Sequence, residues 1–170
     1  VGGSVWEQDG AIYKLKSCPA GYYVSPASVD ASNAALQECK PCGKGEECVT
    51  ASCVTCTACQ AGYYKAAVST DPCTACPANT YAEGVGSTAL SSCLSCQASS
   101  STASAGQSSR RACACDKEYY LIISQEGTDD EALSCQVCPK GAVCGGDGEC
   151  ALRNADANFS CTDGTSSIVG

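Results

Sequence analysis

Large apolar residues occur along this chain only in short stretches, and their pattern predicts strands rather than long helices. The longest stretch, Tyr119–Ile123, has the length of one β-strand. Ala11–Lys16 alternates weakly between apolar and polar residues and predicts a second strand, while Ser166–Gly170 is a short β-prone tail. No apolar run approaches the roughly 18 residues that a membrane-spanning helix needs, so we expect no direct membrane insertion.

The other apolar positions follow cysteines in a repeated pattern. A typical unit runs from a cysteine through a turn-forming residue to two consecutive aromatic residues, as in Cys18-Pro-Ala-Gly-Tyr-Tyr. We expect the aromatic side chains to pack over the neighbouring disulfide, and Leu36, Leu90 and Leu133 to pack back on the aromatic of their own unit. A fourth unit has serine and alanine through Ser99–Ser109 instead, and we expect a loose loop there that is a candidate for O-linked glycans.

The composition shows that disulfides must replace a conventional core. The chain has 18 cysteines in 170 residues, whereas Val, Ile, Leu and Phe together number 23. With a net charge of -8, so few large apolar residues would by themselves predict disorder. A bridge that closes a loop of ~15 residues can contribute about 3 kcal/mol of stability. We therefore predict a small disulfide-rich fold: an elongated tandem array of cysteine-rich modules with short β-hairpins and little helix.

The spacing of the cysteines leaves their connectivity open, but one arrangement keeps every bridge local. Five simple units then close on themselves: Cys18–Cys39, Cys59–Cys73, Cys76–Cys93, Cys96–Cys113 and Cys115–Cys135. Two groups of four cysteines hold interlaced bridges: Cys42–Cys53 with Cys48–Cys56, and Cys138–Cys150 with Cys144–Cys161. All eighteen cysteines are oxidised in this arrangement, and none is left free.

This arrangement implies five consecutive parts. They are an N-terminal strand-like segment at residues 1–17, one simple and one interlaced module at 18–58, three to four tandem simple repeats at 59–137, an interlaced two-disulfide module at 138–161, and a C-terminal tail at 162–170.

The residue inventory argues against an enzyme. Histidine is absent, which removes the usual catalytic triad and any imidazole base. A Cys-x-x-Cys pair can be a redox active site or half of a zinc site, but six such pairs in tandem favour structural bridges. We predict no catalytic residues, no bound metal and no cofactor. The acidic pI of about 4.4 argues against nucleic acid as a partner.

So many paired thiols persist only in an oxidising compartment, so we expect an extracellular protein, secreted or at the cell surface. Because no signal peptide begins at Val1, we expect the sequence to be a mature chain or a fragment of a longer one. Asn158-Phe-Ser is an N-glycosylation sequon, which predicts a glycan on Asn158.

The Cys-Pro-Ala-Gly-Tyr-Tyr…Cys-x-x-Cys frame resembles the cysteine-rich repeats of ephrin-type receptors and their relatives in large surface proteins. It is also similar to tumour necrosis factor receptor modules, whose two-bridge units the interlaced groups resemble. The density of Cys-x-x-Cys pairs resembles protist variant surface antigens, and the Ser/Ala/Thr-rich loops resemble ciliate and algal surface and flagellar-hair proteins. The resemblance covers about residues 18–161 and implies an extracellular architecture, which receptors, coats and filaments share.

The small surface residues favour a structural role, as a self-associating building block of an extracellular coat, fibre or filament. Residues outside the array are then predicted to make the chain-to-chain contacts: Trp6, Ile12, Tyr13, Leu15, Ile168 and Val169. The alternative is a receptor-like ectodomain that binds a protein ligand along a cysteine-rich rod, and a secreted toxin or inhibitor is a third class.

Overall fold

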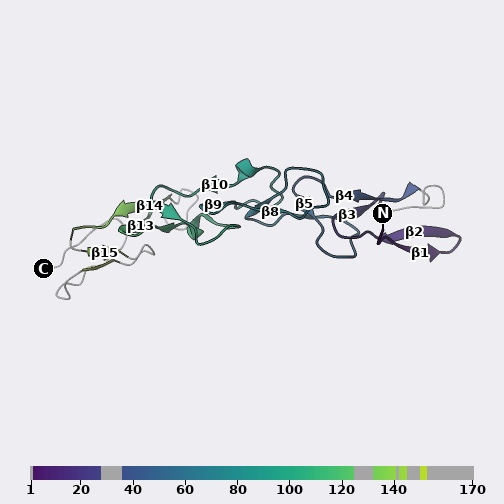
Figure 1. The fold of residues 1–170 in the computed structure, drawn as a ribbon, viewed down its shortest axis with the longest axis horizontal. Coiled ribbons are helices and arrows are strands. Elements are labelled where there is room, and N and C mark those ends of the chain that lie inside the picture. Colours follow the sequence, from purple (N-terminus) through teal and green to yellow (C-terminus); the bar gives the residue numbers. More distant parts are fainter. Residues whose placement is uncertain (1, 28–35, 125–131, 141, 145–149, 153–170) are drawn as a thin grey trace. The chain divides into compact units, whose positions relative to one another are not determined.

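The computed structural model describes residues 2–27, 36–124, 132–140, 142–144 and 150–152 (Figure 1). These residues form eight two-stranded antiparallel sheets, in each of which disulfide-bonded cysteines lie in or beside the strands. They contain two single-turn 3₁₀ helices, η2 (Leu90–Ser92) and η3 (Arg110–Ala112), and no α-helix. The prediction of a small disulfide-rich fold with short hairpins and little helix is confirmed.

The strands pair two by two in chain order, so each sheet is a single hairpin. The sheets are β1 (Val5–Asp9) with β2 (Ile12–Ser17), β3 (Tyr22–Ser25) with β4 (Glu38–Pro41), β5 (Glu46–Glu47) with β6 (Thr57–Ala58), β7 (Tyr63–Tyr64) with β8 (Thr74–Ala75), β9 (Thr80–Tyr81) with β10 (Leu94–Ser95), β11 (Ser100–Ser101) with β12 (Ala114–Cys115), β13 (Tyr119–Ser124) with β14 (Ala132–Val137), and β15 (Ala142–Cys144) with β16 (Cys150–Leu152).

From β3 onward, the first strand of every hairpin begins four residues after a cysteine, which we call the opening cysteine of a module. The opening cysteines are Cys18, Cys42, Cys59, Cys76, Cys96, Cys115 and Cys138. Except in Cys53-Val-Thr-Cys56, the two residues inside a Cys-x-x-Cys motif lie in the return strand of the hairpin, as β8 does between Cys73 and Cys76. The motif therefore joins the closing cysteine of one module to the opening cysteine of the next.

A turn with a fixed backbone conformation follows each opening cysteine. Its third residue has a positive φ in all six described cases: Gly21, Gly45, Gly62, Asn79, Ser99 and Glu118. In the module that begins at Cys59, the N–H of Tyr63 donates to the carbonyl of Gln60 at 3.1 Å across this turn. A positive φ at the third of four turn residues is the pattern of a type II turn, which favours Gly or Asn. We call this third residue the turn residue.

The turn residue also connects each module to the next one. Its carbonyl accepts a hydrogen bond from the following opening cysteine, as in Cys59 N–H to Gly45 O at 2.8 Å; at Ser99 the donor is instead Asp116, one residue after Cys115. Its N–H donates to the sixth residue of the following module, as in Gly45 N–H to Lys65 O at 3.0 Å. In the serine-rich fourth unit, Thr102 Oγ1 accepts from Asn79 N–H at 2.8 Å instead, and Asn79 Oδ1 accepts from Thr102 N–H. The loop expected to be loose is thus tied to its neighbour by side-chain hydrogen bonds.

The small cores form around the opening cysteines. The sixth residue of a module is buried in five modules: Val24, Lys65, Ala82, Thr102 and Cys144. In the first module, Tyr22 and Cys39 pack against a core of Leu15, Cys18 and Val24, which confirms the expected aromatic packing there.

The predicted packing of the leucines is wrong for Leu36 and Leu90, which are both exposed, whereas Leu133 is buried. Leu90 lies in the single-turn helix η2, which has no buried residue. The buried leucine, Leu133, lies in β14, where Ile123 of β13 is its cross-strand partner.

The contacts divide the chain into two compact units. The first comprises Val1–Cys76 and Ala82–Cys93, and the second comprises Pro77–Tyr81 and Leu94–Gly170. Every hydrogen bond between modules described above lies within one of these units.

The five simple bridges occur in the structure as predicted, with Cα–Cα distances of 5.6 to 5.8 Å: Cys18–Cys39, Cys59–Cys73, Cys76–Cys93, Cys96–Cys113 and Cys115–Cys135. These distances lie within the range that a disulfide requires. Each bridge joins an opening cysteine to the closing cysteine of its own hairpin.

The interlaced pairing is wrong in both groups. Cys42 pairs with Cys56, not Cys53, because Cys42 and Cys56 occupy the opening and closing positions of an ordinary module. Cys48 pairs with Cys53, not Cys56, because the loop between them turns back on itself and brings their Cα atoms to 6.2 Å.

In the last group, Cys138 pairs with Cys144, with a Cα–Cα distance of 6.0 Å. This bridge excludes both predicted pairs, Cys138–Cys150 and Cys144–Cys161. The turn after Cys138 leads directly into β15, which ends at Cys144, so the nearer cysteine is the one within reach. Cys161 lies outside the described residues, as does the side chain of Cys150.

Candidate functional site

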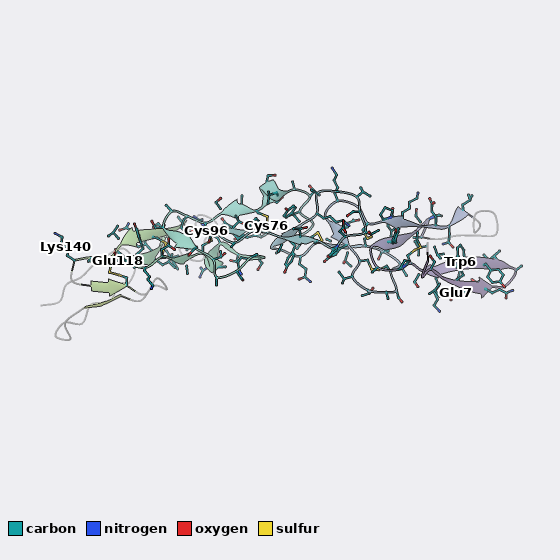
Figure 2. The ribbon with its side chains drawn as sticks, viewed as in Figure 1. Trp6, Glu7, Cys76, Cys96, Glu118 and Lys140 are labelled. Carbon is teal, nitrogen blue, oxygen red and sulfur yellow. A yellow bond between two sulfur atoms is a disulfide. The ribbon has the colours of Figure 1, made fainter. Side chains whose placement is uncertain are left out.

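The N-terminal hairpin, formed by β1 and β2, carries four of the predicted interaction residues. A two-residue loop joins its strands, and Gly10 in that loop has a φ of 61°, a conformation that tight hairpin turns need. Figure 2 shows Trp6 and Glu7 side by side on β1. The strand expected at Ala11–Lys16 is thus present as β2, and it is paired along one edge with β1.

One face of the hairpin is apolar and open to solvent. Trp6 lies opposite Leu15 and Gln8 lies opposite Tyr13, so these four side chains share a face. Trp6 is 49% exposed and Tyr13 is 62% exposed. Two large aromatic side chains, diagonal to each other across the strands, thus form the most exposed aromatic surface of the described residues. We call Trp6 and Tyr13 the aromatic pair.

The opposite face of the hairpin is held by ion pairs. Lys14 Nζ lies 2.7 Å from Asp9 Oδ2 and 3.7 Å from Glu7 Oε1, and Lys16 Nζ lies 3.1 Å from Glu7 Oε2. The hydrogen bond from Lys14 lowers the pKa of Asp9, and the same bond raises the pKa of Lys14. All four groups are solvent-exposed enough that salt screens the pairs, so they orient the hairpin more than they stabilise it.

The base of the hairpin is fixed to the first module. Leu15 is only 6% exposed and packs against Cys18 and Val24. Its N–H donates to Oε1 of Gln37 at 2.7 Å, and Nε2 of Gln37 donates to the carbonyl of Pro26 at 3.1 Å. Leu15 is therefore a core residue, and its predicted role as a surface contact is wrong. Ile12 is partly buried on the face with the ion pairs.

The remaining predicted site residues are not placed by the structure. Asn158, Ile168 and Val169 lie outside the described residues. Among the described residues, no three Cys, Asp or Glu side chains are arranged to hold a metal ion, and no helix is long and apolar enough to cross a membrane.

Comparison with known proteins supports the resemblance in the middle of the chain. Residues 45–93 match the family of tyrosine-protein kinase ephrin type A/B receptor-like sequences. The match covers less than a third of the chain and includes the bridges Cys48–Cys53, Cys59–Cys73 and Cys76–Cys93. No curated protein matches the chain in sequence.

The disulfides and the matched repeats together indicate an extracellular or secreted protein. Repeats of this kind are generally non-enzymatic.

Proposed function

We propose that the chain is an extracellular structural protein, a building block of a cell-surface coat, fibre or filament that assembles through its termini. The observation that carries this proposal is the aromatic pair on the N-terminal hairpin. Trp and Tyr bury large areas with little loss of conformational freedom, and they are enriched at protein interfaces. A second copy of the chain is the partner that the proposal requires, and a contact between unlike ends of two copies repeats into a filament unless it closes.

The shape of the hairpin supports such a contact. Its apolar face and its charged face are separated by the strand alternation, so a partner can cover Trp6 and Tyr13 without desolvating Lys14 or its carboxylate partners. The proposal extends to glycans on Asn158 and on the serine-rich loop Ser99–Ser109, which removal by glycosidases would reveal as a mass shift.

The test is the assembly of the full-length chain with the aromatic pair replaced. Deleting the first 16 residues is unsuitable, because Leu15 belongs to the core of the first module. Trp6→Ser combined with Tyr13→Ser keeps that core, and Val85→Ser is a matched control at a position that is 71% exposed. Sedimentation velocity and electron microscopy should show assembly for the wild type and the control, and loss of assembly for the double variant.

A receptor-like ectodomain is the second candidate, and the match of residues 45–93 to ephrin-receptor-like sequences favours it. This candidate replaces the structural one if the wild-type chain stays monomeric at high concentration. If the double variant assembles like the wild type, the aromatic pair is not the surface through which the chain assembles. The next experiment would then be a binding screen against extracellular proteins. It would compare the full chain with a chain that lacks the cysteine-rich modules.

A further inference from the structure

One disulfide is an addition to an otherwise ordinary module. Cys42–Cys56 already joins the opening and closing cysteines of its hairpin, with a sequence separation of 14, as in Cys59–Cys73. Cys48–Cys53 lies inside that loop and spans a separation of only 5. A shorter closed loop restricts the unfolded chain less, so this bridge contributes less stability than the bridges around it. Its presence therefore calls for a reason other than holding its own module together.

The neighbouring modules show that the fold does not need a covalent link at these positions. Cys53 corresponds to Ser69 in the next module and to Gly86 in the one after it, because each of the three donates its N–H to the opening cysteine of the preceding module. In the next module, Lys65 stands at the position of Cys48. Its Nζ donates to the carbonyl of Ser69 at 2.7 Å, so a noncovalent link replaces the disulfide. In the following module the two positions are Ala82 and Gly86, which have no such side-chain link.

The bridge does, however, hold the segment on which the first module docks. We call residues 48–54 the docking segment. Cys18 and Cys53 exchange two backbone hydrogen bonds, of 2.8 and 2.9 Å. Gly21 N–H donates to Cys48 O at 2.8 Å, and Val24 N–H donates to Val54 O at 3.1 Å. Four backbone hydrogen bonds thus tie the first module to the docking segment. The Cys48–Cys53 bridge closes this segment into a loop and so fixes its conformation.

The bridge is accessible from one side. Like the other described bridges, it pairs a half-buried cysteine, Cys48, with a buried one, Cys53, which is 2% exposed. It alone among them encloses a loop, residues 49–52, that is exposed throughout. An attacking thiolate can therefore approach the sulfur of Cys48 with the sulfur of Cys53 as the leaving group. Bridges at accessible positions are the ones most often reduced under physiological conditions.

We propose that Cys48–Cys53 is a redox switch: an extracellular dithiol reduces it and so releases the first module, with the N-terminal hairpin, from the docking segment. One thiolate of the dithiol bonds to Sγ of Cys48 while the S–S bond breaks. The electron pair stays on Sγ of Cys53, which takes a proton from water. The second thiol of the dithiol then attacks the mixed disulfide and frees Cys48, so the dithiol leaves oxidised and the protein has gained two electrons.

The test is graded reduction of the full-length chain with dithiothreitol, followed by rapid alkylation and peptide mass spectrometry. We expect Cys48 and Cys53 to be alkylated about tenfold faster than Cys42 and Cys56. Hydrogen exchange of the Gly21 and Val24 amides should then accelerate by about tenfold or more. The amide of Gly62 is the internal control, because it donates to Ala82 O in a different pair of modules and should not change.

A variant separates the switch from general reduction. Cys48→Ser with Cys53→Ser should fold, keep the slow exchange of Gly62, and show the fast exchange of Gly21 and Val24 without any reductant. The proposal is overturned if another bridge is reduced first, if the Gly21 and Val24 amides stay protected after Cys48 and Cys53 are alkylated, or if the double variant fails to fold and the bridge is thereby shown to be indispensable. None of these outcomes bears on assembly through the aromatic pair.

Discussion

At the scale of single residues, one backbone conformation recurs through the chain. The turn residue must have a positive φ, which costs a non-glycine residue about 1–2 kcal/mol. Three turn residues are glycine and one is Asn79, the types that adopt this conformation most readily. Ser99 and Glu118 adopt it as well, so the tertiary contacts of those modules impose a conformation that the local sequence disfavours.

Replacing a turn glycine should therefore destabilise the fold by two separate effects. Gly45 has a φ of 70°, and a Cβ atom added to it would clash with the carbonyl oxygen of Gly86. We expect Gly45→Ala to lower the free energy of unfolding by about 2 kcal/mol or more, and to lower the melting temperature by several degrees. Gly84→Ala is the control, since no atom lies within 4 Å of its added Cβ. Equal melting temperatures for the two variants, measured by calorimetry, would contradict this account.

The opposite change is expected at Glu118. Its φ of 70° is strained for a glutamate, so Glu118→Gly should relieve that strain. After allowing for the extra freedom that glycine gains in the unfolded chain, we expect a stabilisation of about 0.5–1 kcal/mol. Lys117→Gly, at the preceding exposed position with an ordinary φ, should destabilise instead. Denaturant unfolding of both variants with the disulfides intact measures the difference, and a loss of stability in Glu118→Gly would show that the carboxylate makes a larger contribution than the backbone strain.

At the scale of elements, two successive modules hold the loop beyond their first hairpin strand by different chemistries at equivalent positions. The module of Cys42 uses a disulfide, whereas the module of Cys59 uses the buried ammonium of Lys65. Lys65 donates to the carbonyls of Glu46 and Ser69 at 3.0 and 2.7 Å and so bridges two modules of the first unit. A buried lysine is rare unless its charge is compensated, and the nearby carboxylates of Glu47 and Asp71 supply that compensation.

Lys65→Met should remove both hydrogen bonds while keeping most of the side-chain volume. Two partly buried carbonyls then lose a partner, and we expect the free energy of unfolding to fall by about 1–3 kcal/mol at neutral pH. Lys44→Met, at an exposed position, is the control and should change it little. Thermal unfolding of the two variants provides the comparison, and an unchanged stability of Lys65→Met would mean that the cost of burying the charge cancels its hydrogen bonds.

The same lysine predicts a dependence on pH. Desolvation lowers the pKa of Lys65 in the folded protein below its ordinary value of 10.5, although the nearby carboxylates act in the other direction. Between the folded and unfolded pKa values the unfolded chain binds more protons, so the stability of the wild type rises with pH across the interval that ends near 10.5. The rise should be absent from Lys65→Met, and parallel pH profiles of the two proteins would refute it.

At the scale of the whole molecule, the local features were the predictable ones. The five simple bridges follow from sequence because each closes one hairpin, and the Cys-x-x-Cys spacing marks its end. The Cys48–Cys53 bridge does not follow in this way, because it joins no opening and closing cysteine and lies where Cys53 docks on Cys18, a contact between modules that no spacing reveals.

Two other features could have been found by comparing charges and positions. Glu7 lies opposite Lys14, and Asp9 and Lys16 pair with them on the same face, so the complementary charges were a signal for the β1–β2 hairpin. Aligning the chain on its opening cysteines would also have placed Cys42 among them, since Gly45 follows it at the turn position as Gly21 follows Cys18. The buried state of Lys65 had no such signal, because composition alone assigns a lysine to the surface.

The last prediction concerns the dimensions of the entire chain. Val, Ile, Leu and Phe number only 23 of 170 residues, and the buried apolar residues of the described part are mostly cysteines in separate modules. Such a chain has no means of collapsing around one core, so we predict an extended array. Small-angle scattering should give a radius of gyration well above the ~15 Å of a compact globule of this length.

The matched control is the same chain measured in high and low salt, because a net charge of -8 could expand it by repulsion alone. A radius near ~15 Å would contradict the modular account, and a radius that shrinks to that value in high salt would assign the extension to charge rather than to the disulfide-linked modules.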